Sequence, residues 1–334
     1  MVTQAQIAQK LGVSRQLVTF ALAGNTKMVS DKTRERILAA ATSMGYRPNP
    51  HARALKMQRT GIIALWIPNL VSSHFARVAR EFGRVVKQAN YDLVISEVGD
   101  RDMQQMLSHV PVDGICVVDK PEAVQMQFNT FKARAIPVVS AGGYFSRKTD
   151  CVQVDLLAGT LDAMEHLIGS GYRRILHVTS VRESLPSESR RLGYLRTLRK
   201  ASLKPEFAYY PSPQTDQMLP FIRQMIKDHI RDHGTPEAVF CHSDDAALGV
   251  YRGLCDLGLR VPKDVALVGC DGTSHMEYLP CSLTTIAQPV PLMCATAWQF
   301  LQQRIEQPSH PLQHAVLKSS LEIRESSKRM AVIS

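Results

Sequence analysis

Two side chains near the N-terminus, Arg15 and Gln16, are of the types that read the edges of bases. An Arg side chain forks onto guanine, and a Gln side chain onto adenine, in the major groove of DNA. Both open the segment RQLVTFALAG, in which Thr19 and Phe20 follow about one helical turn later. The spacing predicts a helix with a base-reading face. For Arg15, a phosphate contact or plain solvent exposure is the alternative.

Start and stop signals divide the first 45 residues into three short helices. The segment TQAQ at residues 3–6 has the form of a capping box, in which Thr3 and the Gln amide satisfy free amides of the first turn. Ser14 and Ser30 are candidate N-caps of the next two helices. A glycine follows each helix, at positions 12, 24 and 45. Two short helices joined by a tight turn are the pattern of a helix-turn-helix.

These helices are expected to share a small core. The residues that should face it are Val18, Ala21, Ile37, Leu38 and Ala41. A unit of this size is too small to be an enzyme, yet it is sufficient to bind DNA.

The positive charge of the chain is concentrated in the same segment. The full sequence has 334 residues and a formal net charge of +10. Residues 1–60 carry ten Lys and Arg residues against two acids, whereas the rest of the chain is nearly neutral. A basic head on a neutral body fits a module that binds a polyanion. The alternative is a charged end that only aids solubility.

The seven cysteines do not suggest a metal site or disulfides. They are odd in number and form no Cys-x-x-Cys pair. None lies in the first 60 residues, which excludes a head stabilised by cysteine-bound zinc. The histidines are too dispersed to argue for a metal, and we expect no cofactor. Without a signal peptide or an apolar stretch near 18 residues, the chain is expected to be cytoplasmic, with no membrane partner.

From residue 61 the chain alternates short apolar runs with amphipathic segments. The expected strands are 61–67, 92–95, 114–118, 137–140, 174–178, 238–241 and 265–269. The expected helices are 75–88, 101–109, 157–169, 189–201 and 245–257. Apolar strands separated by helices imply parallel sheets covered on both faces. Dividing the strands between two sheets predicts two α/β lobes, with a ligand cleft beyond the carboxyl ends of the strands.

Over essentially the full chain the sequence resembles the LacI/GalR family of bacterial transcription regulators. The resemblance rests on ordered segments, among them IAQKLGVSRQLVTFALAG, VDLLAGTLDAMEHLIGSGYRRILHV and AVFCHSDDAALGVYRGLCDLGLRVPKDVALVGCD. It implies a three-helix helix-turn-helix head and a bilobal body of the periplasmic-binding-protein type with two parallel-sheet subdomains. It also implies a homodimeric repressor that binds a pseudo-palindromic double-stranded operator and responds to a small-molecule effector.

The resemblance also implies the DNA-binding residues. They are Thr3, Ser14, Arg15, Gln16, Thr19, Phe20, Asn25, Ala52, Arg53, Leu55 and Lys56. The head departs from the family at Phe20, where many members have an Arg. A Phe ring cannot hydrogen-bond a base edge, so Phe20 either touches a thymine methyl group or packs inward, and the operator is expected to differ there.

The segment after the head looks like the family's hinge helix. Asn49 is a good N-cap, and Pro50 occupies the first helical position, where its missing amide costs nothing. A helix ending near Met57 is too short to be stable alone, so it should order on DNA. In the family, Leu55 matches the leucine that wedges into a base step of the minor groove. A plain flexible linker is the alternative.

Effector-binding residues are expected at the strand ends of the body. They are Ser73, His74, Phe75, Arg147, Arg190, Ser243, Asp244 and Asp271. Arg190 matches the family's effector-gripping arginine, since a guanidinium can fork onto vicinal hydroxyls or an anion. Asp244 has the alternative role of capping the helix that follows it.

Two departures bear on the effector. Gly142 and Gly272 stand where many family members have an Asp, so two acceptors are lost. Together with Arg147 and Lys148, this makes a sugar acid or a sugar phosphate conceivable beside a neutral sugar.

The expected boundaries follow from these elements. Residues 1–46 form the DNA-binding head and 47–60 the hinge helix and linker, while 61–334 bind effector and dimerise. Within the last, one subdomain spans about 61–153 and 290–317, and the other about 154–289 and 318–334.

Two other functions were weighed. A solute-binding protein shares the bilobal body, but the basic head and the missing signal peptide argue against it. An enzyme is disfavoured because His242, Ser243 and Asp244 are sequence neighbours, which cannot form a hydrogen-bonded relay. No phosphate loop or nucleophile elbow appears either.

The expected wedge gives a first prediction. Leu55→Ala should weaken binding to a specific operator far more than binding to unrelated DNA, because only the specific complex opens a base step. Fluorescence anisotropy with both kinds of duplex measures the two affinities. Equal losses on the two duplexes would count against the wedge.

Overall fold

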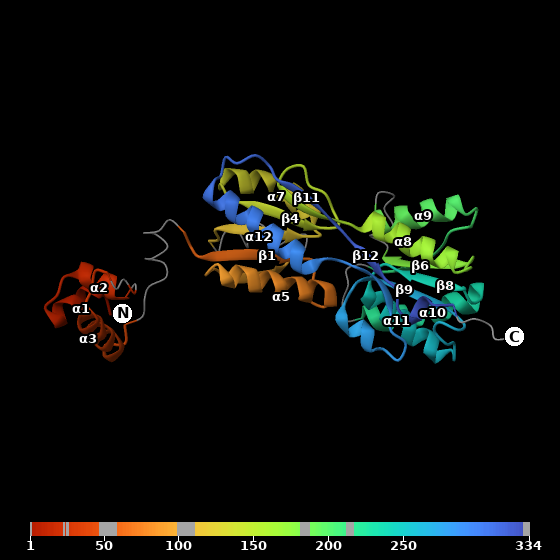
Figure 1. The fold of residues 1–334 in the computed structure, drawn as a ribbon, viewed down its shortest axis with the longest axis horizontal. Coiled ribbons are helices and arrows are strands. Elements are labelled where there is room, and N and C mark those ends of the chain that lie inside the picture. The colour runs from red at the N-terminus through yellow and green to blue at the C-terminus, as the bar shows by residue number, and fades with distance from the viewer. Residues whose placement is uncertain are drawn as a thin grey trace. The chain divides into compact units, whose positions relative to one another are not determined.

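The computed structural model describes residues 2–22, 24, 27–46, 59–98, 111–180, 188–211 and 217–329. The chain forms two compact units, the head Met1–Thr60 and the body Gly61–Ser334 (Figure 1). Several expectations fall outside the described residues: Asn25, the hinge residues Ala52, Arg53, Leu55 and Lys56, and the helix over 101–109.

The head contains the three expected helices, α1 (Gln4–Leu11), α2 (Arg15–Leu22) and α3 (Asp31–Ser43). The capping box forms: Gln6 donates its backbone amide to the Thr3 hydroxyl, and Thr3 donates its own amide to the Gln6 side chain. Ser14 accepts the amide of Leu17 at 3.1 Å. Ser30 precedes α3, but its hydroxyl bonds Thr33 and makes no cap hydrogen bond.

One core prediction for the head is wrong. Ile37 and Ala41 are buried as expected, but Leu38 is 40% exposed and Ala40 takes the inward place. A step of about 100° per residue puts positions 37, 40 and 41 on one stripe of the helix and turns position 38 away from it. The full core of the head is Ile7, Ala8, Val18, Ala21, Val29, Ile37, Ala40 and Ala41.

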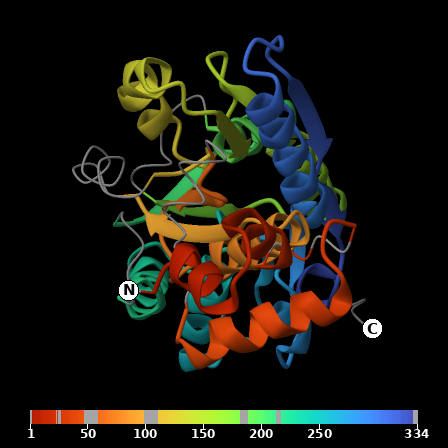
Figure 2. The ribbon, with the colours of Figure 1, turned by 90° about the vertical axis from the view of Figure 1, so that its left-hand side faces the viewer.

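The first lobe of the body, the N-lobe, has a six-stranded sheet in the order β11-β5-β4-β3-β1-β2, all parallel. Its strands are β1 (Ile62–Ile67), β2 (Asp92–Glu97), β3 (Gly114–Val118), β4 (Val138–Gly142), β5 (Asp150–Asp155) and β11 (His314–Lys318). Helices α5 (Ser73–Gln88) and α12 (Val290–Glu306) pack on one face, and α7 (Pro121–Ala133) on the other. Figure 2 shows α7 and α12 on opposite sides of the strands.

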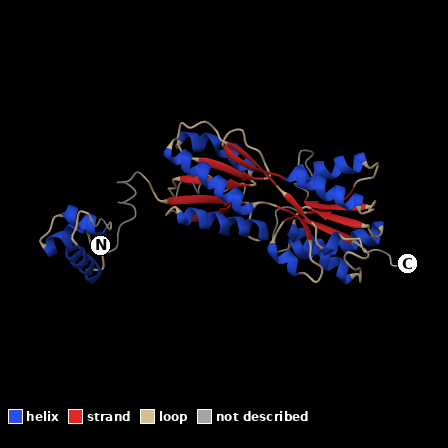
Figure 3. Ribbon diagram, viewed as in Figure 1, coloured by secondary structure: helices blue, strands red, loops and turns tan. Residues whose placement is uncertain are grey.

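The second lobe, the C-lobe, has the order β12-β10-β9-β8-β6-β7. Its strands are β6 (Ile175–Ser180), β7 (Glu206–Tyr210), β8 (Ala238–Cys241), β9 (Ala266–Asp271), β10 (Thr284–Ala287) and β12 (Ser320–Glu322), which alone is antiparallel. Helices α8 (Leu156–Gly169) and α9 (Ser189–Lys200) cover one face, and α10 (Met218–His233) and α11 (Asp244–Asp256) the other (Figure 3). Short 3₁₀ turns occur at Ser274–Tyr278 and Glu325–Ser327.

The chain crosses between the lobes three times. The crossings follow β5, β10 and β11, near residues 155, 288 and 319. The largest apolar cluster runs through both lobes, from Leu65 and Trp298 to Tyr194 and Phe240. The predicted fold class, a helix-turn-helix head with a bilobal α/β body, is confirmed, although several elements from β5 to β12 were not anticipated individually.

The adjacent residues Ile37 and Leu38 of α3, one buried and one exposed, supply a test of the head's core. Ile37→Ala should lower the free energy of unfolding of the head by about 2–5 kcal/mol, because it opens a cavity beside Val18. Leu38→Ala, on the same helix, is the matched control and should change it by less than about 1 kcal/mol. Helix loss on heating the full chain, followed by circular dichroism, measures both. Equal destabilisation would contradict the assigned face.

Candidate functional site

The outer face of the head presents the side chains singled out for base reading. Arg15 and Gln16 are exposed at the start of α2, directly after the capping Ser14. Thr19 is held by its hydroxyl, which donates to the Gln4 side chain at 2.9 Å or to the Arg15 carbonyl at 3.0 Å. The same turn of α2 thus offers two unburied side chains of the base-reading types.

Phe20, one turn after Gln16 on α2, is not exposed as Gln16 is. Its ring is partly buried and packs against the core cluster of the head. This is the inward alternative, and it stabilises the head.

In the body, the carboxyl ends of the C-lobe strands gather a buried polar cluster. Its centre is Arg190, the second residue of α9, which is only 8% exposed. Arg190 donates through Nε to Glu188 Oε1 at 2.8 Å, and through a terminal nitrogen to the His242 carbonyl at 3.2 Å. The guanidinium therefore ties the start of α9 to the end of β8.

Glu188 has two tasks. It caps α9 by accepting the Arg191 amide at 2.7 Å, and it neutralises Arg190. Burial alone would raise the pKa of the Glu188 carboxyl, but the Arg190 charge and the hydrogen bonds outweigh it, and the pKa is lowered. The carboxylate is thus held charged beside the guanidinium.

Asp271 ends β9, and its carboxyl group is buried. Its backbone has a φ of 130°, and Gln288 donates to its Oδ1 at 2.9 Å. Burial, followed by the nearby charge of Asp244, raises the pKa of Asp271 well above its usual range. The carbonyl oxygen of the Gln288 side chain is buried with no hydrogen-bond partner among the described residues.

His74 reaches the same cluster from the N-lobe. It is the second residue of α5, 3% exposed, and its Nδ1 lies 3.8 Å from Asp271 Oδ1. Burial, helped by the charges of Arg190 and Arg77, lowers the pKa of His74 to about 3. The imidazole is therefore neutral, so the approach to Asp271 is not an ion pair. Neither ring nitrogen has a hydrogen-bond partner within the described chain.

Asp244 does not have the capping role that was its alternative. Ser243 is the N-cap of α11, accepting the Ala246 amide at 3.1 Å. The Asp244 carboxylate instead accepts the amide and hydroxyl of Thr273, at 2.7 and 2.8 Å, and the Thr285 hydroxyl at 2.6 Å. These hydrogen bonds join the segment after β9 to β10 and so hold the backbone next to Asp271 in place.

Two contacts, which we call the interlobe latch, join α5 to the C-lobe. The Ser73 amide donates to Asp245 Oδ2 at 3.0 Å, and Arg77 donates to the Gly272 carbonyl at 2.8 Å. A carboxylate at the amino end of α5 also interacts favourably with the helix dipole. The latch closes the cleft on the side of His74.

The remaining expected residues lie at the margin. Phe75 is partly buried against the main apolar cluster, with its ring edge-on to His74 at 5.2 Å. Arg147 is exposed on the loop between β4 and β5. The ammonium group of Lys148 lies 5.3 Å from the centre of the Phe128 ring.

Four described residues of the cluster and latch were not named from the sequence, Arg77, Glu188, Asp245 and Gln288, and His242 was named only as a member of a rejected catalytic relay. Glu188, two residues before Arg190, carried a usable signal, because an acid before a helix is a good cap. Gln288 likewise follows a strand. The contacts of Arg77 and Asp245 across the lobes have no local signal.

Within the described residues, no group of three or more His, Cys, Asp or Glu side chains is placed to hold a metal ion. Among the described helices, none has the length and apolar character needed to cross a membrane.

Comparisons with known proteins agree with the division into a head and a bilobal body. Residues 4–49 match the family described as bacterial regulatory proteins, lacI family, and residues 164–327 match the periplasmic binding protein-like domain. The chain is 28% identical to the ribose operon repressor of Haemophilus influenzae, with 98% of each chain covered. It is 27% identical to the HTH-type transcriptional repressor PurR of Vibrio vulnificus, with 99% of this chain and 100% of the relative covered.

Two solved structures cover nearly the whole chain. The lac repressor dimer bound to operator and the anti-inducer ONPF has a TM-score of 0.80 at 23% identity, covering 98% of this chain and 99% of that one. The complex of the transcriptional regulator CelR with cellobiose has a TM-score of 0.66 at 25% identity, covering 98% and 100%.

The neutral His74 makes stability depend on pH. Its pKa falls from 6.5 to about 3 on folding, so between these values the unfolded chain binds a proton that the folded chain does not. Stability therefore decreases as the pH drops below about 6.5. His74→Phe should reduce the slope of unfolding free energy against pH, between pH 6 and 4, by up to about 1.4 kcal/mol per unit.

Urea unfolding of the full chain at several pH values measures that slope. His177 and His242 are also buried with lowered pKa values, so the difference between variant and wild type is the informative quantity. His275→Phe, at an exposed position, is the control. An unchanged slope in His74→Phe would show that the imidazole is not held neutral.

Proposed function

We propose that this chain, a member of the lacI family of bacterial regulatory proteins, is a cytoplasmic repressor whose affinity for operator DNA is set by a small molecule bound in the cleft. It binds a pseudo-palindromic operator as a homodimer. The observation that carries the proposal is the pairing of a helix-turn-helix head with a buried cluster of unpartnered polar atoms between two lobes.

The head supports sequence-specific binding. Arg15 and Gln16 project from the first turn of α2, the turn that enters the major groove in helix-turn-helix proteins. The hinge residues Ala52, Arg53, Leu55 and Lys56 are proposed to add minor-groove contacts. Thr3 and Ser14, whose side chains cap α1 and α2, are proposed to lie near phosphates together with Thr19 and Asn25.

The charges of the cleft favour a neutral effector. The carboxyl groups of the cluster and latch are those of Glu188, Asp244, Asp245 and Asp271, and the guanidinium groups are those of Arg77 and Arg190. Both guanidinium groups already donate to protein oxygens. Because Arg77 and Arg190 are already engaged by protein oxygens, neither is set aside as a partner for an anion, so a neutral sugar is preferred to a sugar acid or sugar phosphate.

The unpartnered atoms support a ligand with hydroxyl groups. A neutral imidazole offers one donor and one acceptor, and the Gln288 side chain offers an acceptor. A hydroxyl group both donates and accepts, so a polyol can satisfy all of them. The complex of a similar regulator with cellobiose agrees with this class of effector.

The latch supports a route from effector to DNA. A ligand that hydrogen-bonds both His74 of the N-lobe and Asp271 of the C-lobe contacts both lobes, so it changes the relative stability of closed and open arrangements of the body. The strand β1 starts at Ile62, directly after the segment that links head and body. A shift of α5 and β1 would therefore alter the geometry available to the hinge.

No catalytic role is included in the proposal. The Ser243 hydroxyl is committed to the Ala246 amide, and the Asp244 carboxylate to Thr273 and Thr285. These neighbours therefore form no relay with His242. A solute-binding protein without DNA-regulatory role is the alternative function.

The experiment is binding of the full chain to DNA from around its own gene, by anisotropy at two salt concentrations. Arg15→Ala should weaken binding to the specific site by about 10-fold, since a bidentate base contact contributes about 1–3 kcal/mol. Arg36→Ala removes the same charge from an exposed position on α3 and is the matched control. It should weaken specific and unrelated DNA alike.

Two outcomes would oppose the proposal. Site-independent binding under all conditions would indicate an architectural DNA-binding protein. A body that binds sugar while the full chain ignores DNA would indicate the solute-binding alternative.

A further inference from the structure

The N-lobe wall of the cleft contains a carboxylate that the sequence comparison with the family did not supply. Asp119 directly follows β3, and Gly142 ends the neighbouring β4. Both strands run parallel to β1, so their carboxyl ends lie along one edge of the sheet. At that edge the connection from β1 to α5 meets the C-lobe through Ser73. Asp119 therefore lies on the cleft side of the sheet.

The Asp119 carboxylate occupies the space that a side chain at position 142 would need. A Cβ atom built on Gly142 would lie 2.2 Å from Asp119 Oδ1 and 2.5 Å from its Cγ. Gly142 has a φ of 118°, a conformation that side chains rarely adopt. The adjacent Gly143 donates its amide to Asp119 Oδ1 at 2.7 Å. The glycine at 142 and the carboxylate of Asp119 are thus two parts of one arrangement.

The backbone of Asp119 is shaped for this placement. Its φ of 47° lies in the left-handed region, which Asp tolerates better than most residues. Its amide donates to the Ala141 carbonyl at 3.0 Å, which keeps the ends of β3 and β4 together. Unusual backbone of this kind is common at ligand clamps.

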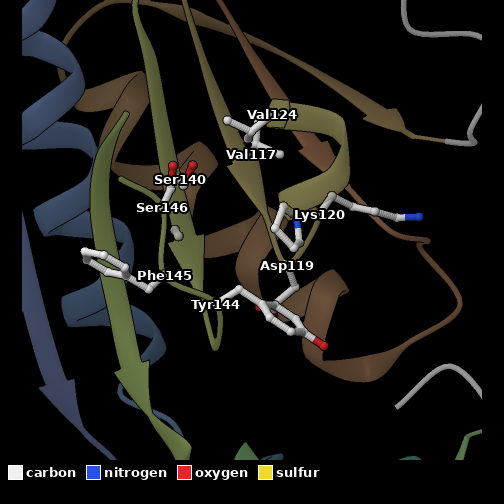
Figure 4. A pocket seen from close by; sticks show the side chains of 10 residues that line it. Val117, Asp119, Lys120, Val124, Ser140, Tyr144, Phe145 and Ser146 are labelled. Carbon is white, nitrogen blue, oxygen red and sulfur yellow. The ribbon is translucent and has the colours of Figure 1, made fainter. Parts of the chain in front are cut away.

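The immediate surroundings of Asp119 are polar and aromatic. A hollow beside Asp119 is lined by Lys120, Ser140, Tyr144, Phe145 and Ser146. In Figure 4 the side chains of Asp119 and Tyr144 lie next to each other at one end of it. An aromatic ring beside a carboxylate offers an apolar face for C–H groups and an acceptor for hydroxyls.

The second missing acceptor is not restored in the same way. At Gly272, a Cβ atom would lie 2.7 Å from the Ala287 Cα, so backbone excludes a side chain there. Among the described residues, Asp119 at the end of β3 and Asp271 at the end of β9 each place a carboxyl group at the carboxyl edge of their sheet.

We infer that Asp119, seated in the space left by Gly142, is the specificity-determining carboxylate of the N-lobe, accepting hydrogen bonds from hydroxyl groups of a neutral effector. The inference rests on the proposed function. The competing role is purely structural: a clamp that holds the ends of β3 and β4 together through Gly143.

Asp119→Asn separates the two roles, because the amide oxygen of Asn can still accept the Gly143 amide while the charge is lost. The control is Asp113→Asn. Asp113 flanks the other end of β3 and accepts the Gly61 amide at 2.9 Å, so it makes a matching contact away from the cleft. Asp119→Ser, which keeps an acceptor, is the second variant if the first fails to fold.

The full chain and its variants are titrated calorimetrically with D-ribose, cellobiose and other neutral mono- and disaccharides. The sugar that binds the wild type most tightly becomes the probe. Asp119→Asn should weaken its binding by at least about 10-fold, since hydrogen bonds to charged groups contribute about 1.5–3 kcal/mol. Asp113→Asn should stay within about 2-fold of wild type, and sugar-free operator binding should be unchanged in both variants.

The outcomes separate this inference from the proposed function. Wild-type affinity in Asp119→Asn, or equal losses in Asp119→Asn and Asp113→Asn, would overturn the role of Asp119 alone. A wild type that binds operator but none of the sugars would overturn the neutral effector and this inference together.

Discussion

Burying Arg190 is the constraint on which the cleft depends. An unpaired buried charge is strongly destabilising, so a guanidinium at this position needs a carboxylate and further acceptors around it. Glu188 supplies the charge and at the same time caps α9, while the His242 carbonyl supplies an acceptor at the end of β8. The Glu188–Arg190 ion pair thereby sets the start of α9 and its connection to the end of β8. Around it lie the neutral imidazole of His74 and the Gln288 side chain, whose carbonyl oxygen has no hydrogen-bond partner among the described residues.

The fold could be predicted where a local rule decides. Capping residues and glycines delimited the helices of the head, and continuous apolar strands between helices required parallel sheets. The prediction of the buried face of α3 was wrong at Leu38. Ile37 and Leu38 are both apolar and adjacent, and only the position of the buried Ala40 shows that Ile37 lies on the buried face. The strands β5 and β11 were also missed. β5 begins and ends with Asp, and β11 alternates exposed with half-buried residues, so neither reads as a buried strand.

The site could be predicted only in part, for a related reason. The carboxyl ends of parallel strands meet at one edge, so polar residues such as Asp271 were identified from their positions alone. Asp244 and Asp245 are identical and adjacent, yet one accepts hydrogen bonds within its own lobe and the other accepts an amide from the opposite lobe. The turn of α11 decides between them, and the partner of Asp245 lies 172 positions away in the chain. Gly142 was read as a missing acceptor, and the carboxylate beside it belongs to Asp119, which follows another strand, β3.

The three crossings between lobes have a consequence for how the protein is made. The N-lobe contains β1 near its beginning, but α12 and β11 come only after most of the C-lobe. During synthesis, the face that α12 covers stays bare until about residue 306 has left the ribosome. The C-lobe, complete except for β12, therefore has time to fold first, although its sequence begins later. The N-lobe, whose first strand follows the head in the sequence, is the last to close, which delays a finished body until the chain is almost entirely translated.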